Sequence, residues 1–555
     1  MKKIGKITLL LLLIFAVGAI LRFYRLGDAP FGFHRDEAFL GYNAYSILLT
    51  GKDISGNFLP LHLKSFLYSP AGYSYLSIPF IKLFDLSPFS VRFASAFFGS
   101  LTILTTFLLT KQLFREFKYS DHLGMLSAFL LAISSWHINL SRTATENIIV
   151  VFFITLGVYF YLYSVKKKSM WSLLISFLLF GVTLFIYQAP RAFLPLFVPL
   201  LILTYGASYK RIAVSFIAFF LVICLPLVFI LSSKDLSLRL RTVSIFATSE
   251  TQLILNDHIL TDGTKGTQLI LTRIFHNKLA FYTQQFLKNY FSHFSYNFLF
   301  SDGGFPDRYR VPLAGLLYIV ELPLILFGSF KLLTVDKRSS IFLLGWIGLA
   351  PLGSALTFDD IPNLQRSLVV FTSLSIVTAF GMWHFALFLK KNNWLRIIGI
   401  IFVFIFIYNI FFYLHQYYTH GSIYRPWYRQ DGYKELVTKV NKLLGVSKRT
   451  VVTDRESAPT IFFLFYLKYS PDRFQQETKG TKMKDFDRIS FGQYEFSQEE
   501  CPLRLIEKNG KMIAIGEKDV LYVDSGLCKI PHSVEVLGTI KRLDNSLVFS
   551  ILSPF

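Results

Sequence analysis

Long runs of apolar residues constrain this chain of 555 residues more strongly than any other feature of its sequence. Residues 7–21 (ITLLLLLIFAVGAIL) form the first run, and runs of similar length recur as far as about residue 413. A helix of about 20 apolar residues is long enough to cross the hydrocarbon core of a bilayer. The chain is therefore expected to be a polytopic α-helical membrane protein.

The composition agrees with a membrane protein, and its charge pattern does not indicate a nucleic-acid-binding protein. Hydrophobic residues make up 53% of the sequence and the mean hydropathy is +0.47, which is far more apolar than a soluble protein of this size. The net charge of +22 comes from Lys and Arg residues that stand in short clusters between the apolar runs. Such clusters are typical of cytoplasmic loops, so the basic excess does not indicate a nucleic-acid partner.

Hydropathy predicts about eleven transmembrane helices. They are expected near residues 6–23, 89–113, 122–139, 147–164, 170–187, 191–206, 211–232, 312–331, 340–356, 366–389 and 395–413. The basic N-terminus and the basic short loops then fall on one side, which places the N-terminus in the cytoplasm. No A-x-A-like cleavage site follows the first helix, so we read it as a retained anchor rather than a signal peptide.

This topology predicts two domains in an inner (plasma) membrane protein. Residues 1–413 form a transmembrane domain with extracytoplasmic loops at 24–88 and 233–311, and residues 414–555 form an extracytoplasmic α/β domain. In this second domain KELVTKVNKLL predicts a helix, and RTVVTD, DVLYVDS and SLVFSILS predict strands. The segment APTIFFLFYLKY fits a buried helix or a buried strand.

The extracytoplasmic segments carry three further predictions. Residues 36–50 indicate a short amphipathic helix that ends at Gly51, and FYTQQFLKNYFSHFSYNFLFSDGG indicates an interfacial helix followed by a loop. Cys501 and Cys528 both fall outside the cytoplasm, where disulfides form, so we hypothesise a bridge between them.

An ordered set of short motifs resembles a known superfamily. Asp36 and Glu37 follow the first span, and the helix after them ends at Gly51-Lys52-Asp53. The segments SPAGYSYLSIPF, SVRFASAFFGSLTI, SRTATENIIVVFFITLGVYFYLYS and YQAPR then follow in order. The set resembles the GT-C membrane glycosyltransferases, in particular the branch of protein O-mannosyltransferases and aminoarabinose lipid A transferases. The resemblance covers roughly the first 200 residues, and the rest agrees only in hydropathy.

The resemblance implies an inverting glycosyltransferase that moves a monosaccharide from a polyprenyl phosphate. Its acceptor would be a lipid, a protein or a glycan on the extracytoplasmic face. Asp36 matches the catalytic base, Glu37 is a supporting residue, and Glu146 matches a second acid that positions acceptor or sugar. Such a transfer needs a base near the acceptor hydroxyl and cations near the leaving phosphate. His34 is a candidate on the acceptor side.

Four residues near the outer ends of spans are candidates for binding the donor phosphate: Arg142, Tyr187, Arg191 and Arg366. The resembling branch carries a Lys-Pro-Pro-Leu-Tyr run in the first loop, but here Ser69 stands where its lysine would fall. Donor phosphate recognition is therefore expected to depend on the arginines.

Each assignment has a structural alternative that stays open. Asp36, Glu37 and Glu146 each begin a predicted helix, where a carboxylate stabilises the helix dipole. Arg142 and Arg191 equally suit interfacial anchors, and Arg366 has Asp359 and Asp360 nearby in sequence as partners.

No cofactor is expected from this sequence. His34, Asp36 and His62 lie in one loop, but their spacing is not specific for zinc. Members of the GT-C superfamily differ in whether they use a divalent ion, so a metal stays possible, although we expect none to be essential.

A transporter or flippase for a lipid-linked sugar is the alternative function. Transporters usually have pseudo-symmetric halves and broken helices near the bilayer midplane. The sequence shows no internal repeat, and its notable charges fall near the outer ends of spans. A structural scaffold is a third reading, which the cluster of family motifs does not favour.

Overall fold

The computed structural model describes most of the chain and divides it into two compact units. The described residues are 5–63, 69–233, 237, 242–246, 249–390, 393–443, 448–480, 488–508, 511–517, 519–531 and 534–554. Unit 1 comprises Met1–Tyr24, Ser95–Ser141 and Thr145–Leu414. Unit 2 comprises Arg25–Ala94, Arg142–Ala144 and His415–Phe555. The loop between the first two predicted spans thus shares a unit with the tail.

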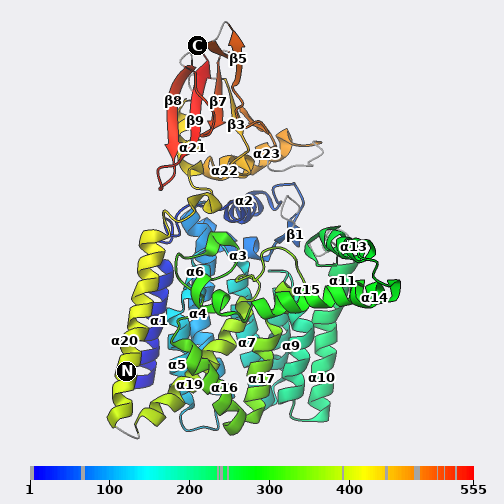
Figure 1. The fold of residues 1–555 in the computed structure, drawn as a ribbon. Helices are drawn as coiled ribbons and strands as arrows, with labels where there is room; N and C mark the ends of the chain where they lie inside the picture. The colour runs from blue at the N-terminus through cyan, green and yellow to red at the C-terminus, as the bar shows by residue number, and fades with distance from the viewer. Residues whose placement is uncertain are drawn as a thin grey trace. The chain divides into compact units, whose positions relative to one another are not determined.

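Unit 1 is helical (Figure 1). Its helices in chain order are α1 (Lys6–Phe23), α5 (Ser120–Ile133), α6 (Ser135–Ser141), α7 (Glu146–Lys167), α8 (Met170–Thr183), α9 (Pro190–Tyr205), α10 (Tyr209–Phe219), α11 (Leu225–Ser232), α13 (Ser249–Thr264), α14 (Leu269–Phe275), α15 (Lys278–Ser292), α16 (Glu321–Val335), α17 (Lys337–Leu349), α18 (Leu352–Ala355), α19 (Phe371–Leu389) and α20 (Asn393–His415). Helix α4 (Pro88–Leu113) begins in unit 2 and continues in unit 1.

The protein is a multi-pass membrane protein, as predicted. Within the described residues six helical stretches are long and apolar enough to cross a membrane, or up to seven if the bent pair α5 and α6 is one span. The predicted number was about eleven, and the difference has local causes. Helices α8 and α9 have only 14 and 16 residues. Helix α16 begins at Glu321 rather than near residue 312, and α17 ends before Pro351.

Two glycines allow α16 and α19 to pack closely. A Cβ atom added at Gly328 would lie 2.2 Å from the Val377 carbonyl oxygen, and one added at Gly381 would lie 2.0 Å from the Leu324 carbonyl oxygen. Small residues at such crossings let two helix backbones approach within van der Waals contact. The core of unit 1 therefore depends on the absence of side chains at these positions.

Substituting Gly381→Ala is expected to lower the stability of the protein by about 1–3 kcal/mol, because the new methyl group has no space. Thermal unfolding of the purified protein in detergent measures this loss. Gly263→Ala is the matched control, since no atom lies within 4 Å of an added Cβ there. Equal melting temperatures for the two variants would show that α16 and α19 separate without cost.

Unit 2 begins with the loop after α1. This loop forms α2 (Arg35–Thr50), the short strand pair β1 (His62–Leu63) and β2 (Ser69–Pro70), and α3 (Gly72–Phe84). Helix α2 ends at Gly51, whose φ of +71° is the left-handed conformation that glycine adopts without strain. The predicted helix at 36–50 is confirmed with its stop at Gly51, but it is buried along most of its length rather than amphipathic.

The tail in unit 2 forms a mixed sheet with helices. Its elements are α21 (Tyr433–Leu443), β3 (Arg449–Thr453), α22 (Pro459–Tyr466), α23 (Pro471–Glu477), β4 (Tyr494–Ser497), β5 (Arg504–Lys508), β6 (Lys511–Ile515), β7 (Val520–Ser525), β8 (Val534–Lys541) and β9 (Leu547–Pro554). The five-stranded sheet has the order β4-β3-β7-β9-β8, and β5 pairs with β6 in a separate hairpin. Strand β3 is parallel to both neighbours, whereas β9 is antiparallel to β7 and β8. The predicted α/β tail is confirmed, and APTIFFLFYLKY forms the helix α22.

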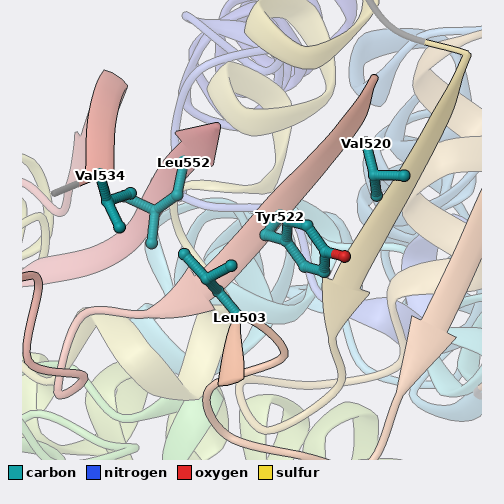
Figure 2. Close-up of a cluster of buried hydrophobic side chains, with 5 residues drawn as sticks. All are labelled: Leu503, Val520, Tyr522, Val534 and Leu552. Carbon is teal, nitrogen blue, oxygen red and sulfur yellow. The ribbon is translucent and has the colours of Figure 1, made fainter. Parts of the chain in front are cut away.

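One hydrophobic cluster holds the hairpin side of this sheet. Leu503, Val520, Tyr522, Val534 and Leu552 are all at most 8% exposed and come from β7, β8, β9 and the residue before β5 (Figure 2). The cluster shows why DVLYVDS and SLVFSILS alternate so little, because strand β7 is buried along its whole length.

A disulfide joins Cys501 to Cys528 across this part of the tail, with the Cα atoms 5.8 Å apart. The hypothesised bridge is thus present. It closes a segment of 27 residues that contains the β5–β6 hairpin and β7.

Removing the bridge by Cys501→Ala with Cys528→Ala is expected to destabilise unit 2 by about 3.5 kcal/mol, the loop-closure value for a cross-link of this span. Thermal unfolding with and without a reducing agent measures the change. Cys224→Ala is the control, because Cys224 has no disulfide partner. A reductant that leaves the wild-type melting temperature unchanged would contradict the expectation.

Candidate functional site

The acidic pair Asp36-Glu37 lies in the first turn of α2, in unit 2. His34 caps this helix: its Nδ1 accepts the backbone N–H of Asp36 at 3.1 Å, and the Glu37 side chain accepts the N–H of His34 at 3.4 Å. Such reciprocal capping fixes the backbone at a helix start. The candidate base is therefore held on a defined helix end rather than on a loose loop.

The Asp36 carboxylate is partly shielded from solvent. Its side chain is 25% exposed, with the His34 ring at 3.5 Å and the Arg35 guanidinium at 4.0 Å. Because His34 Nδ1 already accepts the Asp36 N–H, the neutral imidazole carries its hydrogen on Nε2. At 25% exposure the carboxylate is partly accessible, which a general base for an acceptor hydroxyl requires.

Glu37 lies in a different environment from its neighbour. It is 3% exposed, and its carboxylate accepts hydrogen bonds from Arg92 Nη2 at 2.8 Å, Arg92 Nε at 3.1 Å and the Ala144 N–H at 2.8 Å. Burial alone would raise the pKa of Glu37, but the Arg92 charge and these hydrogen bonds lower it below the usual value. Glu37 is consequently a buried anion.

Arg92 connects this anion to the loop before α2. Its guanidinium donates to the carbonyl oxygens of Leu26, Pro30 and Gly32 at 3.3, 3.0 and 2.7 Å, and Arg92 is fully buried. One arginine in the first turns of α4 thus ties together the loop 26–32 and the start of α2. The ion pair explains why the acidic pair stands in one fixed orientation.

Arg142, predicted to bind the donor phosphate, is also fully buried in unit 2. Its Nη2 donates to the Ala29 carbonyl oxygen at 3.0 Å and its Nε to the Tyr417 hydroxyl at 3.3 Å. The guanidinium also lies 5.4 and 5.3 Å from the ring centroids of Tyr417 and Tyr418. Arg142 is therefore part of the same loop scaffold as Arg92.

The second predicted group lies in unit 1, around the loop before α19. Glu146 begins α7, is 8% exposed and accepts the Gln365 side-chain amide at 3.2 Å. The adjacent Asn147 side chain donates to the Gln365 carbonyl oxygen. Glu146 is thereby joined to the residue directly before Arg366.

Arg366 has protein partners on both ends of its guanidinium. Asp359 binds Nη1 and Nη2 with its two carboxylate oxygens at 3.0 Å each, and Thr357 Oγ1 accepts from Nη1 at 2.6 Å. The Tyr187 side chain interacts electrostatically with the same group. The predicted pairing of Arg366 with Asp359 is confirmed.

Arg191 lies close to this group at the start of α9. Its Nε donates to the Leu184 carbonyl oxygen at 3.2 Å, and its side chain is buried. The preceding residues Ala189 and Pro190 line a small cavity of about 10 Å³ together with Asn147 and Arg366. Unit 1 thus brings Glu146, Tyr187 and Arg366 to one locality beside the start of α9.

A neutral histidine supports the loop that carries Arg366. His293 Nδ1 donates to the Asn289 carbonyl oxygen at 2.8 Å, and Nε2 accepts the Asn363 N–H at 3.1 Å. Burial lowers the pKa of His293 to about 4, so the ring remains an acceptor at neutral pH. The Trp136 indole adds a hydrogen bond to the Leu364 carbonyl oxygen at 2.9 Å.

Sequence reasoning missed three residues that hold these groups: Arg92, Gln365 and the backbone of Ala144. Arg92 had a signal, because an arginine inside a 26-residue apolar helix is costly unless it is paired. Nothing in the sequence points to Gln365 or Ala144, because their contacts depend on how separate loops meet in the fold.

Potential metal ligands are sparse in the described ranges. The one group of three, Cys501, Asp524 and Cys528, has its ligand atoms within 4.8 Å of one another. Its two sulfur atoms are joined in the disulfide, so they are not thiolate ligands.

Comparison with known proteins finds a family match in the N-terminal part of the chain. The family model described as dolichyl-phosphate-mannose-protein mannosyltransferase matches residues 53–186. Over this segment the chain is thus similar to that mannosyltransferase family, while the model does not extend to the rest of the sequence. A search of curated proteins finds no match to the chain.

Two solved structures have a similar fold over most of the chain. The structure of ArnT from Cupriavidus metallidurans bound to undecaprenyl phosphate matches with a TM-score of 0.50 at 12% identity and covers 97% of each chain. The archaeal oligosaccharyltransferase AglB from Archaeoglobus fulgidus, in complex with an inhibitory peptide and a dolichol-phosphate, matches with a TM-score of 0.52 at 13% identity. That match covers 83% of this chain but only 63% of AglB. At such identities the likeness shows the GT-C fold alone.

Proposed function

We propose that the protein is an inverting glycosyltransferase that moves a monosaccharide from a polyprenyl phosphate to an acceptor outside the cytoplasm. The observation that carries the proposal is the Asp36 carboxylate, which is 25% exposed on a helix start that capping and a buried ion pair hold in place. The match of residues 53–186 to the mannosyltransferase family supports the same reaction class.

In this reaction Asp36 accepts the proton of the acceptor hydroxyl while the hydroxyl oxygen attacks C1 of the sugar. The bond between C1 and the phosphate oxygen breaks, and the polyprenyl phosphate leaves with the electron pair. A single displacement of this kind inverts the anomeric centre. The base contributes typically about 10²–10⁴-fold to the rate of such a step.

The remaining residues receive supporting roles in the proposal. Glu37 acts through Arg92 and the helix start as a positioning residue, because its oxygens are fully engaged there. Glu146 orients the acceptor or the sugar from the start of α7. Four residues serve the donor phosphate: Arg142, Tyr187, Arg191 and Arg366. His34 serves the acceptor side as the cap of α2.

The test is sugar release from a panel of radiolabelled polyprenyl-phosphate monosaccharides by the purified protein in lipid, with a crude envelope extract as acceptor source. Turnover of one donor supports the transferase and identifies the sugar. Translocation of a labelled donor across vesicles without sugar release would overturn the proposal in favour of a transporter.

A further inference from the structure

In the hairpin α13–α14 of unit 1 the Leu, Ile and Phe side chains are exposed, except Leu255 of α13, which is 5% exposed. In α14 the side chains of Leu269, Ile270, Ile274 and Phe275 are 57–68% exposed, whereas Thr272 is 5% exposed. In α13 Leu253 and Leu260 are 65% and 68% exposed. A water-facing hairpin would show the opposite arrangement, because burial of apolar surface drives its packing.

Polar groups make the contacts inside the hairpin. His276 Nε2 lies 3.4 Å from Asp262 Oδ2, and the rings of His258 and His276 meet edge to face at 5.3 Å. The Asn277 side chain donates to the carbonyl oxygens of Arg273 and Ile274, at the end of α14. Internal satisfaction of polar groups is what a hydrocarbon environment demands of a polypeptide.

Basic residues stand on the α14 side of the hairpin, whereas α13 carries Glu250, Asp257 and Asp262. From residue 263 to residue 301 the chain has no Asp or Glu, and it has four basic residues, Lys265, Arg273, Lys278 and Lys288. Lys265, Arg273 and Lys278 are exposed. Basic side chains beside exposed apolar ones are typical of segments that lie in the interface of a membrane with anionic lipids.

We propose that the α13–α14 hairpin is inserted into the interface of the same bilayer that the spans cross. The exposed apolar side chains of α14 contact acyl chains, and Lys265 and Arg273, together with Lys278 at the start of α15, contact anionic head groups. The apolar exposure of α14 equals that of the long apolar stretch before it, where Val228 and Phe229 are 59% and 61% exposed. The inference is independent of the proposed transferase activity.

The test places a fluorophore on single cysteines in full-length Cys224→Ser protein, in which Cys501 and Cys528 are paired. The probe positions are Ile270→Cys and Phe275→Cys, with Val228→Cys as the span control and Thr264→Cys as the polar control on the same hairpin. The protein is placed in vesicles of phosphatidylethanolamine and phosphatidylglycerol that contain a doxyl-labelled lipid. Aqueous iodide serves as the opposing quencher.

Doxyl lipid is expected to quench the probes at positions 270 and 275 severalfold, as at 228, while iodide quenches only the probe at 264. Iodide quenching at 270 and 275 would overturn the proposal, and so would protection from both quenchers, which would indicate a protein partner. Vesicles of phosphatidylcholine are expected to weaken doxyl quenching at 270 and 275. Equal quenching there would overturn the assignment of the basic residues to anionic head groups.

Discussion

Substituting Asp36→Asn is expected to lower sugar transfer by about 10²–10⁴-fold, the usual contribution of a general base. Asparagine keeps the size of the side chain and leaves the Asp36 N–H, which His34 accepts, in place. The helix start should therefore persist while the proton acceptor is lost. Initial rates of radiolabelled product formation at saturating donor measure the effect.

Asp85→Asn is the matched control for this substitution. Asp85 lies in the same unit with a side chain that is 64% exposed and pairs with Lys468 on the surface, an interaction of little energetic weight. Its variant is expected to keep wild-type rates. Equal transfer by the Asp36 and Asp85 variants would remove Asp36 from the mechanism and leave the proposed transferase without an assigned base.

Substituting Glu37→Gln is expected to destabilise unit 2 by about 3–5 kcal/mol, because it leaves the buried Arg92 without its counter-charge. The glutamine side chain also has only one acceptor oxygen, because its NH2 group replaces the second carboxylate oxygen. Thermal unfolding of the purified protein in detergent measures this loss of stability. The double variant Glu37→Gln with Arg92→Met is expected to recover part of it, since no uncompensated charge remains.

Acid should act on the same pair with a defined sign. The pKa of Glu37 in the folded protein lies below its usual value of 4.5, so the folded state holds the carboxylate more strongly ionised than the unfolded state. Its contribution to stability is then complete above pH 4.5 and is lost as the pH falls through the lowered pKa. Melting temperatures of the wild type should fall in that acidic range, and those of the Glu37→Gln variant should fall less. A parallel decline in both proteins would exclude Glu37 as the group that titrates.

The sequence was sufficient for the fold class because hydrophobic run length and basic clusters are local properties. The apolar runs, the helix 36–50 with its Gly51 stop and the strands β3, β7 and β9 follow from neighbouring residue types. The disulfide was a hypothesis from the number and expected compartment of the two cysteines, which spacing alone does not establish. Helix lengths were harder to predict. Pro351 and the turns at 312–320 shorten helices inside runs that remain apolar, so hydropathy continues where the helix has ended.

The sequence predicts which residue types belong to the candidate site, but it does not predict which residues contact them. Asp36 stood out through its place after the first span, whereas the different environments of Asp36 and Glu37 depend on Arg92, which lies 55 residues after Glu37. Likewise, Gln365 meets Glu146 across 219 residues. Such pairings arise from the way loops converge on helix ends, and no periodicity in the sequence encodes them.

Helix α2 is surrounded in unit 2 by residues from the far end of the chain, and this has a consequence for biogenesis. The Arg35 N–H donates to Gln430 across 395 residues, the Tyr42 hydroxyl to the Tyr469 carbonyl across 427, and Gln475 to Ser46 across 429. During synthesis α2 emerges long before these partners exist, so unit 2 can close around it only when almost the entire chain has been made. A ribosome that stalls before the tail therefore releases a membrane-inserted protein in which α2 lacks its contacts with Gln430, Tyr469 and Gln475.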